Sequence, residues 1–229
     1  MSAGAVTDAR ARFVRPLLIA FLVASAVDLV GVLADVRLAH LVAKPLLMPL
    51  LAGYAAARRG PRLLIAALLF GWGGDTLLLP DADAAFLIGM GSFAAGHVCY
   101  LWLFGRARSS LLLGAGYAAV LVGFVALIWG GLPVDLRIPM AGYSLLLTAM
   151  AYRSSTRGRY AALGGALFLL SDALIATDIA DWPQLPAPDF WVMLTYIVAQ
   201  FLLTVGVLTP GPERTVATPG AYGERSISI

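Results

Sequence analysis

The sequence predicts an all-α membrane protein, folded as a bundle of eight transmembrane helices with both termini on the cytoplasmic side. Of its 229 residues, 60% are hydrophobic and only 13% are charged, whereas a soluble domain carries about 25% charged residues. The apolar residues gather in eight segments, each close to the roughly 20 residues that a helix needs to cross a bilayer. Arginines mark every second connection between these segments, a pattern that indicates the orientation of membrane helices.

The transmembrane domain is expected to cover residues 16–208, between a cytoplasmic segment at 1–15 and a disordered cytoplasmic tail at 209–229. The tail is predicted to be disordered because it is rich in Pro, Gly, Ser and Thr. The connections inside the domain are short, so consecutive helices are expected to be antiparallel neighbours. The eight segments lie at 16–34, 39–57, 62–80, 84–104, 110–131, 134–152, 159–179 and 190–208.

Prolines and arginines mark the limits of the first three segments. Arginines precede the first segment, as they would in a cleavable signal peptide, but its apolar character continues to Ala34 and favours a retained helix. Pro45 and Pro49 lie inside the second segment, where they kink a helix unless neighbouring groups satisfy the freed carbonyls. Pro61 opens the third segment and Pro80 closes it.

The remaining five segments are bounded by similar signals. Small residues at Gly89, Ser92 and Gly96 form a packing face on the fourth segment. The fifth is apolar throughout, and the sixth begins after Pro133 and contains Pro139. An arginine-rich connection precedes the seventh segment, and a proline-rich connection separates it from the eighth.

The distribution of charge predicts which connections face the cytoplasm. Arginines fill the N-terminal segment and alternate connections, and these positive regions are expected on the cytoplasmic side. The other connections hold only two arginines and carry several aspartates instead, so both termini are predicted to be cytoplasmic. These aspartates are Asp35, Asp81, Asp83, Asp135, Asp181 and Asp189. The net charge of +3 comes from these arginines and does not indicate nucleic acid. The arginines are Arg10, Arg12, Arg15, Arg58, Arg59, Arg62, Arg106, Arg108, Arg153, Arg157 and Arg159.

Cysteine and histidine are too rare for several kinds of site. Cys99 is the only cysteine, so the chain has no internal disulfide and no cysteine-based metal site. His40 and His97 are far apart in the sequence, which argues against a zinc cage. No metal and no other cofactor is expected.

Asp75 is an ionisable residue inside the apolar third segment. A carboxylate there is costly, so it is by default a candidate functional residue whose partner has to be found. Gly71 and Gly74 precede it and allow a neighbouring helix to approach closely. The alternative is that Asp75 only forms hydrogen bonds between packed helices.

Three further ionisable residues are predicted to lie at the depth of Asp75. Asp28, Lys44, Asp75 and Asp172 are each 12 or 13 residues from the cytoplasmic end of their segments. At 1.5 Å per residue, this places all four about 18–20 Å above the cytoplasmic surface. Polar side chains expected nearby are His97, Tyr100, Ser171, Tyr196 and Gln200.

One lysine among three carboxyl groups favours different protonation states in the cluster. Lys44 would keep one carboxylate ionised, while another carboxyl group would keep its proton. Such a pair is what general acid and general base catalysis requires. The alternative is a buried ion pair that fixes helix register, although such pairs seldom add much net stability. The shared depth of the four residues favours a site.

These residues resemble short motifs of the YhhN-type lysoplasmalogenase family of integral membrane proteins. Five motifs occur in the same order and on the corresponding helices, and the resemblance covers about residues 44–200. The motifs are Lys44-Pro45-Leu46, Gly74-Asp75, Gly96-His97-Val98-Cys99-Tyr100, Ser171-Asp172 and Tyr196-Ile197-Val198-Ala199-Gln200. Asp28 belongs to none of them.

The resemblance implies eight helices and hydrolysis of the vinyl-ether bond of a lysoplasmalogen, a lysophospholipid that would be met in a bacterial plasma membrane. The family's two proposed catalytic aspartates correspond to Asp75 and Asp172, with the acid and base roles left open. The other motif residues would orient water or hold the glycerol and phosphate, and the oligomeric state is left open.

Three other functions fit parts of the pattern. A proton- or ion-coupled transporter would also use intramembrane Asp and Lys, and the likeness of 74–78 to 171–175 hints at the internal repeat common in transporters. An intramembrane aspartyl protease is disfavoured because Trp72 stands where its Gly-x-Gly-Asp motif has glycine. A lipid-binding protein without catalysis is the fourth possibility.

Overall fold

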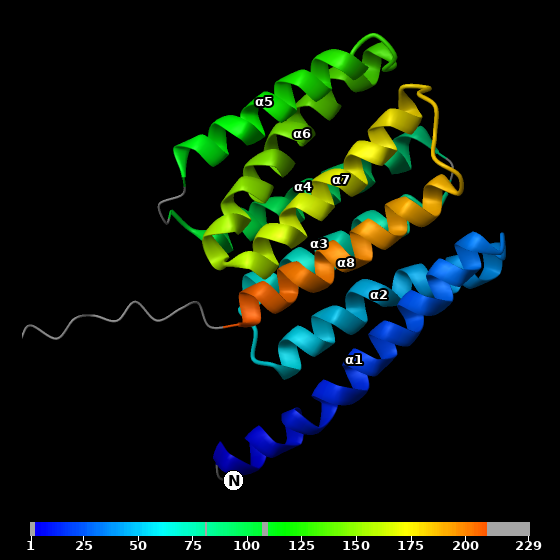
Figure 1. Cartoon of the computed structure of the whole chain (residues 1–229). Helices are drawn as coiled ribbons and strands as arrows, with labels where there is room; N and C mark the ends of the chain where they lie inside the picture. Colours follow the sequence, from blue (N-terminus) through cyan, green and yellow to red (C-terminus); the bar gives the residue numbers. More distant parts are fainter. Residues whose placement is uncertain (1–2, 81, 107–109, 210–229) are drawn as a thin grey trace, which may run out of the picture.

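The computed structural model describes residues 3–80, 82–106 and 110–209, and within them the chain forms eight α-helices and no β-strand (Figure 1). A short 3₁₀ helix, η1 (Ser155–Arg157), joins the sixth helix to the seventh. The α-helices are α1 (Ala3–Leu33), α2 (Arg37–Ala57), α3 (Arg62–Leu77), α4 (Asp83–Phe104), α5 (Leu111–Ile128), α6 (Val134–Ser154), α7 (Arg159–Ile179) and α8 (Pro188–Leu208).

The all-helical fold is confirmed, and apart from the start of α1 every helix boundary lies within three residues of the expected one. In the described part of the chain, six helices (α1, α2, α4, α5, α7 and α8) are long and apolar enough to cross a membrane. The other two are α3, which has 16 residues, and α6, which carries charged residues near both ends.

α1 begins well before the expected start of the first span. The first segment was expected to begin at residue 16, but α1 continues from Ala3 through Pro16 to Leu33. Pro16 removes one backbone N–H from the helix, while the preceding residues are rich in Ala and Arg, which favour helix. The predicted cytoplasmic segment is therefore largely helical. The predicted disordered tail lies almost entirely at 210–229, outside the described residues.

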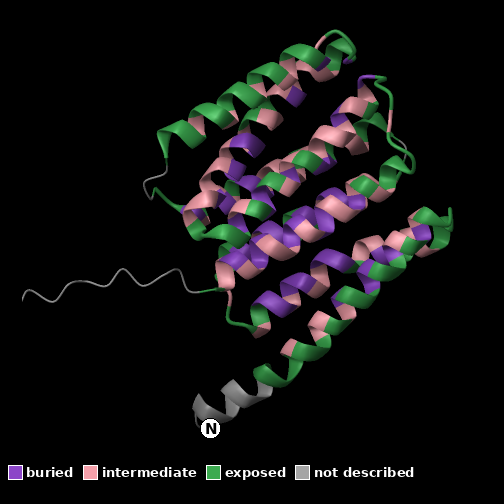
Figure 2. Ribbon diagram, in the orientation of Figure 1, coloured by how far each residue is buried: buried purple, intermediate pink, exposed green. Residues whose placement is uncertain are grey.

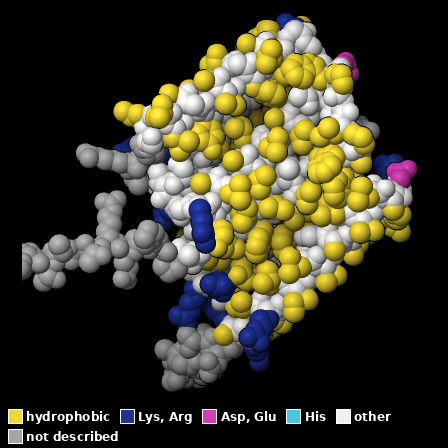
Figure 3. Space-filling model, viewed as in Figure 1, with side chains coloured by type: hydrophobic (Ala, Val, Ile, Leu, Met, Phe, Trp, Pro, Cys, Tyr) yellow, Lys and Arg dark blue, Asp and Glu magenta, His cyan; other side chains and the backbone are white. Residues whose placement is uncertain are grey.

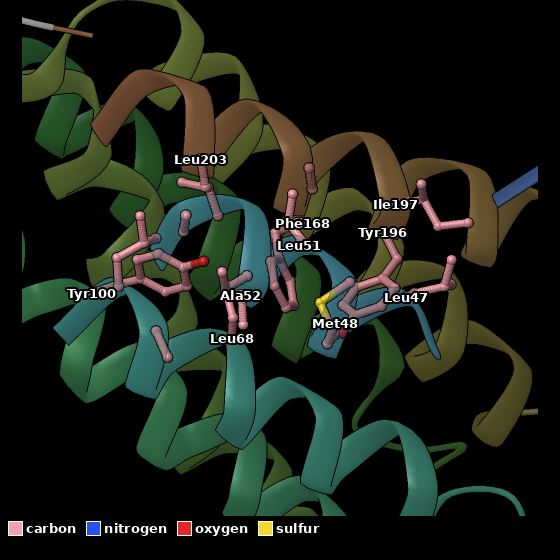
Figure 4. Packing of buried hydrophobic residues seen from close by; sticks show 14 of the residues in the cluster. Leu47, Met48, Leu51, Ala52, Leu68, Tyr100, Phe168, Tyr196, Ile197 and Leu203 are labelled. Atoms are coloured by element: carbon pink, nitrogen blue, oxygen red, sulfur yellow. The ribbon is translucent and has the colours of Figure 1, made fainter. Parts of the chain in front are cut away.

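The core of the bundle lies between α2, α3, α4, α7 and α8. Large side chains from these helices are buried against one another, among them Leu51, Leu68, Tyr100, Phe168 and Leu203 (Figure 4). Figure 2 shows the buried residues concentrated along α8 and α2, whereas most of α5 is exposed. This places α8 at the centre of the packing, where its side chains reach several other helices.

Two glycines allow α7 and α8 to pack closely. A Cβ added to Gly206 would lie 2.5 Å from the backbone nitrogen of Ala161, and one added to Gly164 would lie 2.8 Å from that of Leu203. Backbone atoms cannot yield as a flexible side chain can. Such small-residue contacts are typical of helices that pack within a membrane.

The outer surface matches a lipid environment. Hydrophobic side chains cover most of the face in Figure 3, and many large ones are exposed, such as Trp102 and Leu111. Lys and Arg side chains gather at the end of the bundle where the N-terminus lies, and the Asp and Glu side chains in this view lie at the opposite end. Because exposed apolar surface of this extent is unusual on a soluble monomer, the chain is an integral, multi-pass membrane protein.

Candidate active site

A cavity lies between α2, α3, α4, α6, α7 and α8, and it is called the site cavity below. Its empty space, including its open mouth, is about 730 Å³. Both Asp75 and Asp172 line it, although they lie on different helices far apart in the sequence. The other polar residues in its lining are Lys44, Tyr143, Ser144, Ser171 and Tyr196.

Asp75 is held by hydrogen-bonding residues of α4 and α8. Its side chain is 2% exposed, and its Oδ2 accepts a hydrogen bond of 2.7 Å from the Tyr196 hydroxyl. The Gln200 Nε2 donates to that hydroxyl at 3.5 Å, and the Gln200 Oε1 accepts from the Tyr100 hydroxyl at 2.8 Å. Tyr196 and Gln200 are four residues apart on α8, so they share one helix face. A connected series of side chains therefore leads from Tyr100 to Asp75.

Gly71 makes room for this series. It lies one turn before Asp75 on α3, where an added Cβ would be 3.1 Å from the Gln200 Nε2 and 3.3 Å from the Tyr196 hydroxyl. The close approach expected at Gly71 is therefore present, and the group that approaches belongs to α8.

Asp172 is held by a second series, which comes from α6 and α4. Its Oδ2 accepts a short hydrogen bond from the Tyr143 hydroxyl, and the His97 Nε2 lies 3.1 Å from the oxygen of that hydroxyl. His97 is buried, and its ring packs edge-on against Phe168 at a centroid distance of 4.8 Å. The His97 Nδ1 is buried without a hydrogen-bond partner among the described residues.

Lys44 lines the site cavity without a direct ion pair. Among the described residues, no carboxylate oxygen lies within 4.0 Å of its nitrogen; the one ion pair found there joins His40 and Asp28. The ammonium group of Lys44 thus remains available to an anionic ligand.

Asp28 lies outside the lining of the site cavity. It is fully buried on α1, and its Oδ1 lies 2.9 Å from the Nδ1 of His40 on α2. Its Oδ2 has no hydrogen-bond partner among the described residues. The predicted depth groups Asp28 with Lys44. In the structure, the side chain that contacts Asp28 directly is that of His40, a residue outside the predicted cluster.

The structure adds Tyr143 to the predicted residues. It lies about eleven residues from the cytoplasmic end of α6, or roughly 16 Å, which is within one helical turn of the depth predicted for the aspartates. Ser171 is in the lining as expected, and its hydroxyl donates to the Val192 carbonyl at 3.0 Å. In the described ranges, no three His, Cys, Asp or Glu side chains come together as a metal site would require.

The site cavity continues toward the end of the bundle opposite the N-terminus. A hollow there shares Leu78, Phe86 and Ile179 with the site cavity, and its lining includes Asp83 and Asp135. A ligand that enters by this mouth passes two carboxylates before it reaches Lys44.

The sequence profile of the YhhN family matches residues 39–207, which include both tyrosine-held aspartates. The chain belongs to the YhhN family. This YhhN protein is 37% identical over 155 residues to Lysoplasmalogenase TMEM86B of Homo sapiens, and the match covers 66% of each chain.

Two other relatives have similar names. Lysoplasmalogenase TMEM86B of Sus scrofa is 39% identical over 157 residues, which are 68% of this chain and 65% of the relative. Lysoplasmalogenase of Mycobacterium tuberculosis is 32% identical over 174 residues, which are 69% of this chain and 66% of the relative. The YhhN protein thus spans about 66% of the length of these curated relatives. No solved structure matches it significantly.

Proposed function

We propose that this YhhN-family protein is a membrane-embedded hydrolase that cleaves the vinyl-ether bond of a lysoplasmalogen. The observation that carries the proposal is that Asp75 and Asp172 line one cavity, each held by a tyrosine from another helix. The relatives named lysoplasmalogenase support the substrate class. The products would be a fatty aldehyde and a glycerophospholipid head that carries ethanolamine or choline.

The reaction needs one acid, one base and one water molecule. A neutral carboxylic acid protonates the alkene carbon remote from the ether oxygen, which leaves an oxocarbenium ion. The second aspartate, as a carboxylate, stabilises this cation and takes a proton from the water that attacks it. The resulting hemiacetal then breaks its carbon–oxygen bond. The ether oxygen receives a proton, the hydroxyl loses one, and the aldehyde and the alcohol separate.

The other polar groups of the site cavity would position the substrate. Lys44, which forms no direct ion pair with a described carboxylate, would bind the phosphate. Asp83 and Asp135 at the mouth are opposite in charge to the amine of ethanolamine or choline. Asp28 would not touch the substrate, because its side chain lies outside the lining.

The proposal includes eight crossings of the plasma membrane, with both termini in the cytoplasm. The gathering of Lys and Arg side chains at one end of the bundle supports this orientation. α3 is short, but six of its residues are buried by other helices, so it need not be apolar on every side. The mouth of the site cavity would then face the outer leaflet.

The decisive experiment compares purified wild type with Asp75→Asn and Asp172→Asn. Wild type is expected to release aldehyde from a lysoplasmalogen, and each variant to lose about 10²–10⁴-fold in rate because it lacks the acid or the base. Asn keeps the size of the side chain, and a lysophospholipid with an ordinary ester serves as the substrate control. Aldehyde release that persists in both variants would contradict the mechanism.

A further inference from the structure

A second cavity lies between α5, α6 and α7, and it is called the side cavity below. Its empty space, including the part that is open at the surface, is about 700 Å³, and its lining is apolar except at Ser144, Thr148 and Asp172. Val120, Leu121 and Phe124 of α5 form one wall, while Leu147 of α6 and Ala166 and Leu170 of α7 form much of the rest.

The two cavities meet at the candidate catalytic carboxyl group. Asp172 and Ser144 belong to both linings, and this explains why Asp172 is only half-buried although it lies inside the bundle. The Ser144 hydroxyl forms no hydrogen bond with any described residue. A ligand that bridges the cavities therefore passes directly by Asp172.

The cavities extend in opposite directions from this junction. On α7 the site cavity reaches Ile179, whereas the side cavity reaches Ala166, closer to the arginine-rich end. The thirteen residues between them correspond to about 20 Å along the helix. This is more than half of the roughly 30 Å hydrocarbon core of a bilayer. Much of the lining of the site cavity is apolar, but the site cavity and its mouth carry Lys44, Asp83 and Asp135, whereas the described lining of the side cavity has no charged residue beyond the junction.

We propose that the side cavity holds the alkenyl chain of the lysolipid, with the vinyl-ether bond at the junction beside Asp172. This assignment rests on the proposed function and adds to it the position of the alkenyl chain. In the substrate, the vinyl-ether bond separates a polar glycerophosphate from a long apolar chain. The two cavities reproduce that order, with the catalytic carboxyl groups at the boundary.

α5 is suited to cover such a chain. Ile128 is its one buried residue in the described structure, and α5 packs mainly on α6. The apolar side chains on the face of α5 toward α7 therefore line the side cavity and are not packed tightly against another helix. Away from the junction, Thr148 is the one polar residue of the described lining: it is 5% exposed, and its hydroxyl has no hydrogen-bond partner among the described residues.

The first test narrows the deep end of the side cavity. Ala166→Phe is expected to lower kcat/KM for long-chain lysoplasmalogens by about tenfold or more, because added bulk excludes methylene groups. Short-chain substrates should be hydrolysed as by wild type. The matched control is Ala126→Phe, an exposed position of α5 that lines neither cavity. An equal effect of Ala166→Phe on every chain length, or no effect at all, would overturn the assignment.

The second test asks whether the occupant is apolar. Thr148→Val keeps the shape of the side chain and removes a hydroxyl without a partner, so kcat/KM for long-chain substrates should rise relative to that for short-chain substrates. A loss of long-chain activity in Thr148→Val would indicate a polar occupant and overturn the assignment.

The third test does not depend on catalysis. A non-cleavable ether lysophospholipid with a photoreactive group at its chain end should label residues 120–124 and 166–170. Labelling elsewhere by a protein that releases aldehyde would overturn the side cavity as the chain site and leave the proposed reaction intact. Labelling at these residues without aldehyde release would support the chain site and contradict the reaction.

Discussion

At the scale of single residues, the hydrogen-bond partners distinguish the two aspartates. The Tyr196 hydroxyl donates to Asp75, and its other neighbour, the Gln200 amide nitrogen, is also a donor. Tyr196 therefore has no second acceptor, and Asp75 is suited to remain a carboxylate. The Tyr143 hydroxyl can instead turn its hydrogen toward the His97 Nε2, provided that the histidine proton sits on Nδ1. Asp172 could then carry a proton and donate it. We infer that Asp172 is the acid and Asp75 the base.

Hydrogen exchange from solvent separates these roles. In D₂O, Asp75→Asn should still protonate the alkene carbon reversibly through Asp172, so recovered lysoplasmalogen should contain deuterium at that carbon although little aldehyde forms. Asp172→Asn lacks the acid and should show neither deuterium uptake nor aldehyde. Mass spectrometry of the recovered lipid measures the difference. Deuterium uptake in Asp172→Asn but not in Asp75→Asn would reverse the assignment.

At the scale of helices, the site depends on how closely α3 approaches α8. Gly71→Ala places a methyl group 3.1 Å from the Gln200 Nε2, so the amide and the Tyr196 hydroxyl must shift by a few tenths of an ångström. Because small misplacements of catalytic groups are costly, aldehyde release should fall by about threefold to tenfold. Thermal stability should change little, since the displaced atoms are the ends of side chains.

Gly91→Ala is the matched control for this prediction. Gly91 lies on α4, and an added Cβ there meets nothing within 4 Å, so activity should equal that of wild type. Unchanged activity in Gly71→Ala would show that the Tyr196–Gln200 series does not position Asp75.

The helices were largely predictable because their ends carry strong local signals. Pro61, Pro133 and the arginine-rich connections mark boundaries that the structure reproduces. Depth in the membrane also follows from residue counting, which is why Asp75 and Asp172 were expected together. Direction around the helix axis was not predictable, because each residue advances only 1.5 Å but turns by about 100°. Asp28 therefore pairs with His40 instead of joining the site cavity, and Tyr143 was missed.

At the scale of the whole molecule, the arrangement of the cavities has functional meaning only if the bundle is oriented as proposed. The mouth with Asp83 and Asp135 must face the outside if a lysolipid of the outer leaflet is to enter with its alkenyl chain first and its head group last. α3 and α6 decide the matter, since they are the two described helices that fall short of an independent membrane span. Each is flanked by one arginine-rich connection and by one connection without arginine. The orientation rule therefore places the two ends of each helix on opposite sides of the membrane.

Cysteine labelling in intact cells tests these two helices directly. In a Cys99→Ser background, a membrane-impermeant maleimide should label Ala82→Cys and Gly130→Cys, which follow α3 and precede α6. It should reach Arg59→Cys and Arg157→Cys, at the other ends of the same helices, only after the membrane is opened. Both ends of α3 labelled from one side would mean that α3 does not cross. The outer mouth and the shared depth of the aspartates would then both lose their basis, because Asp75 would no longer lie on a spanning helix.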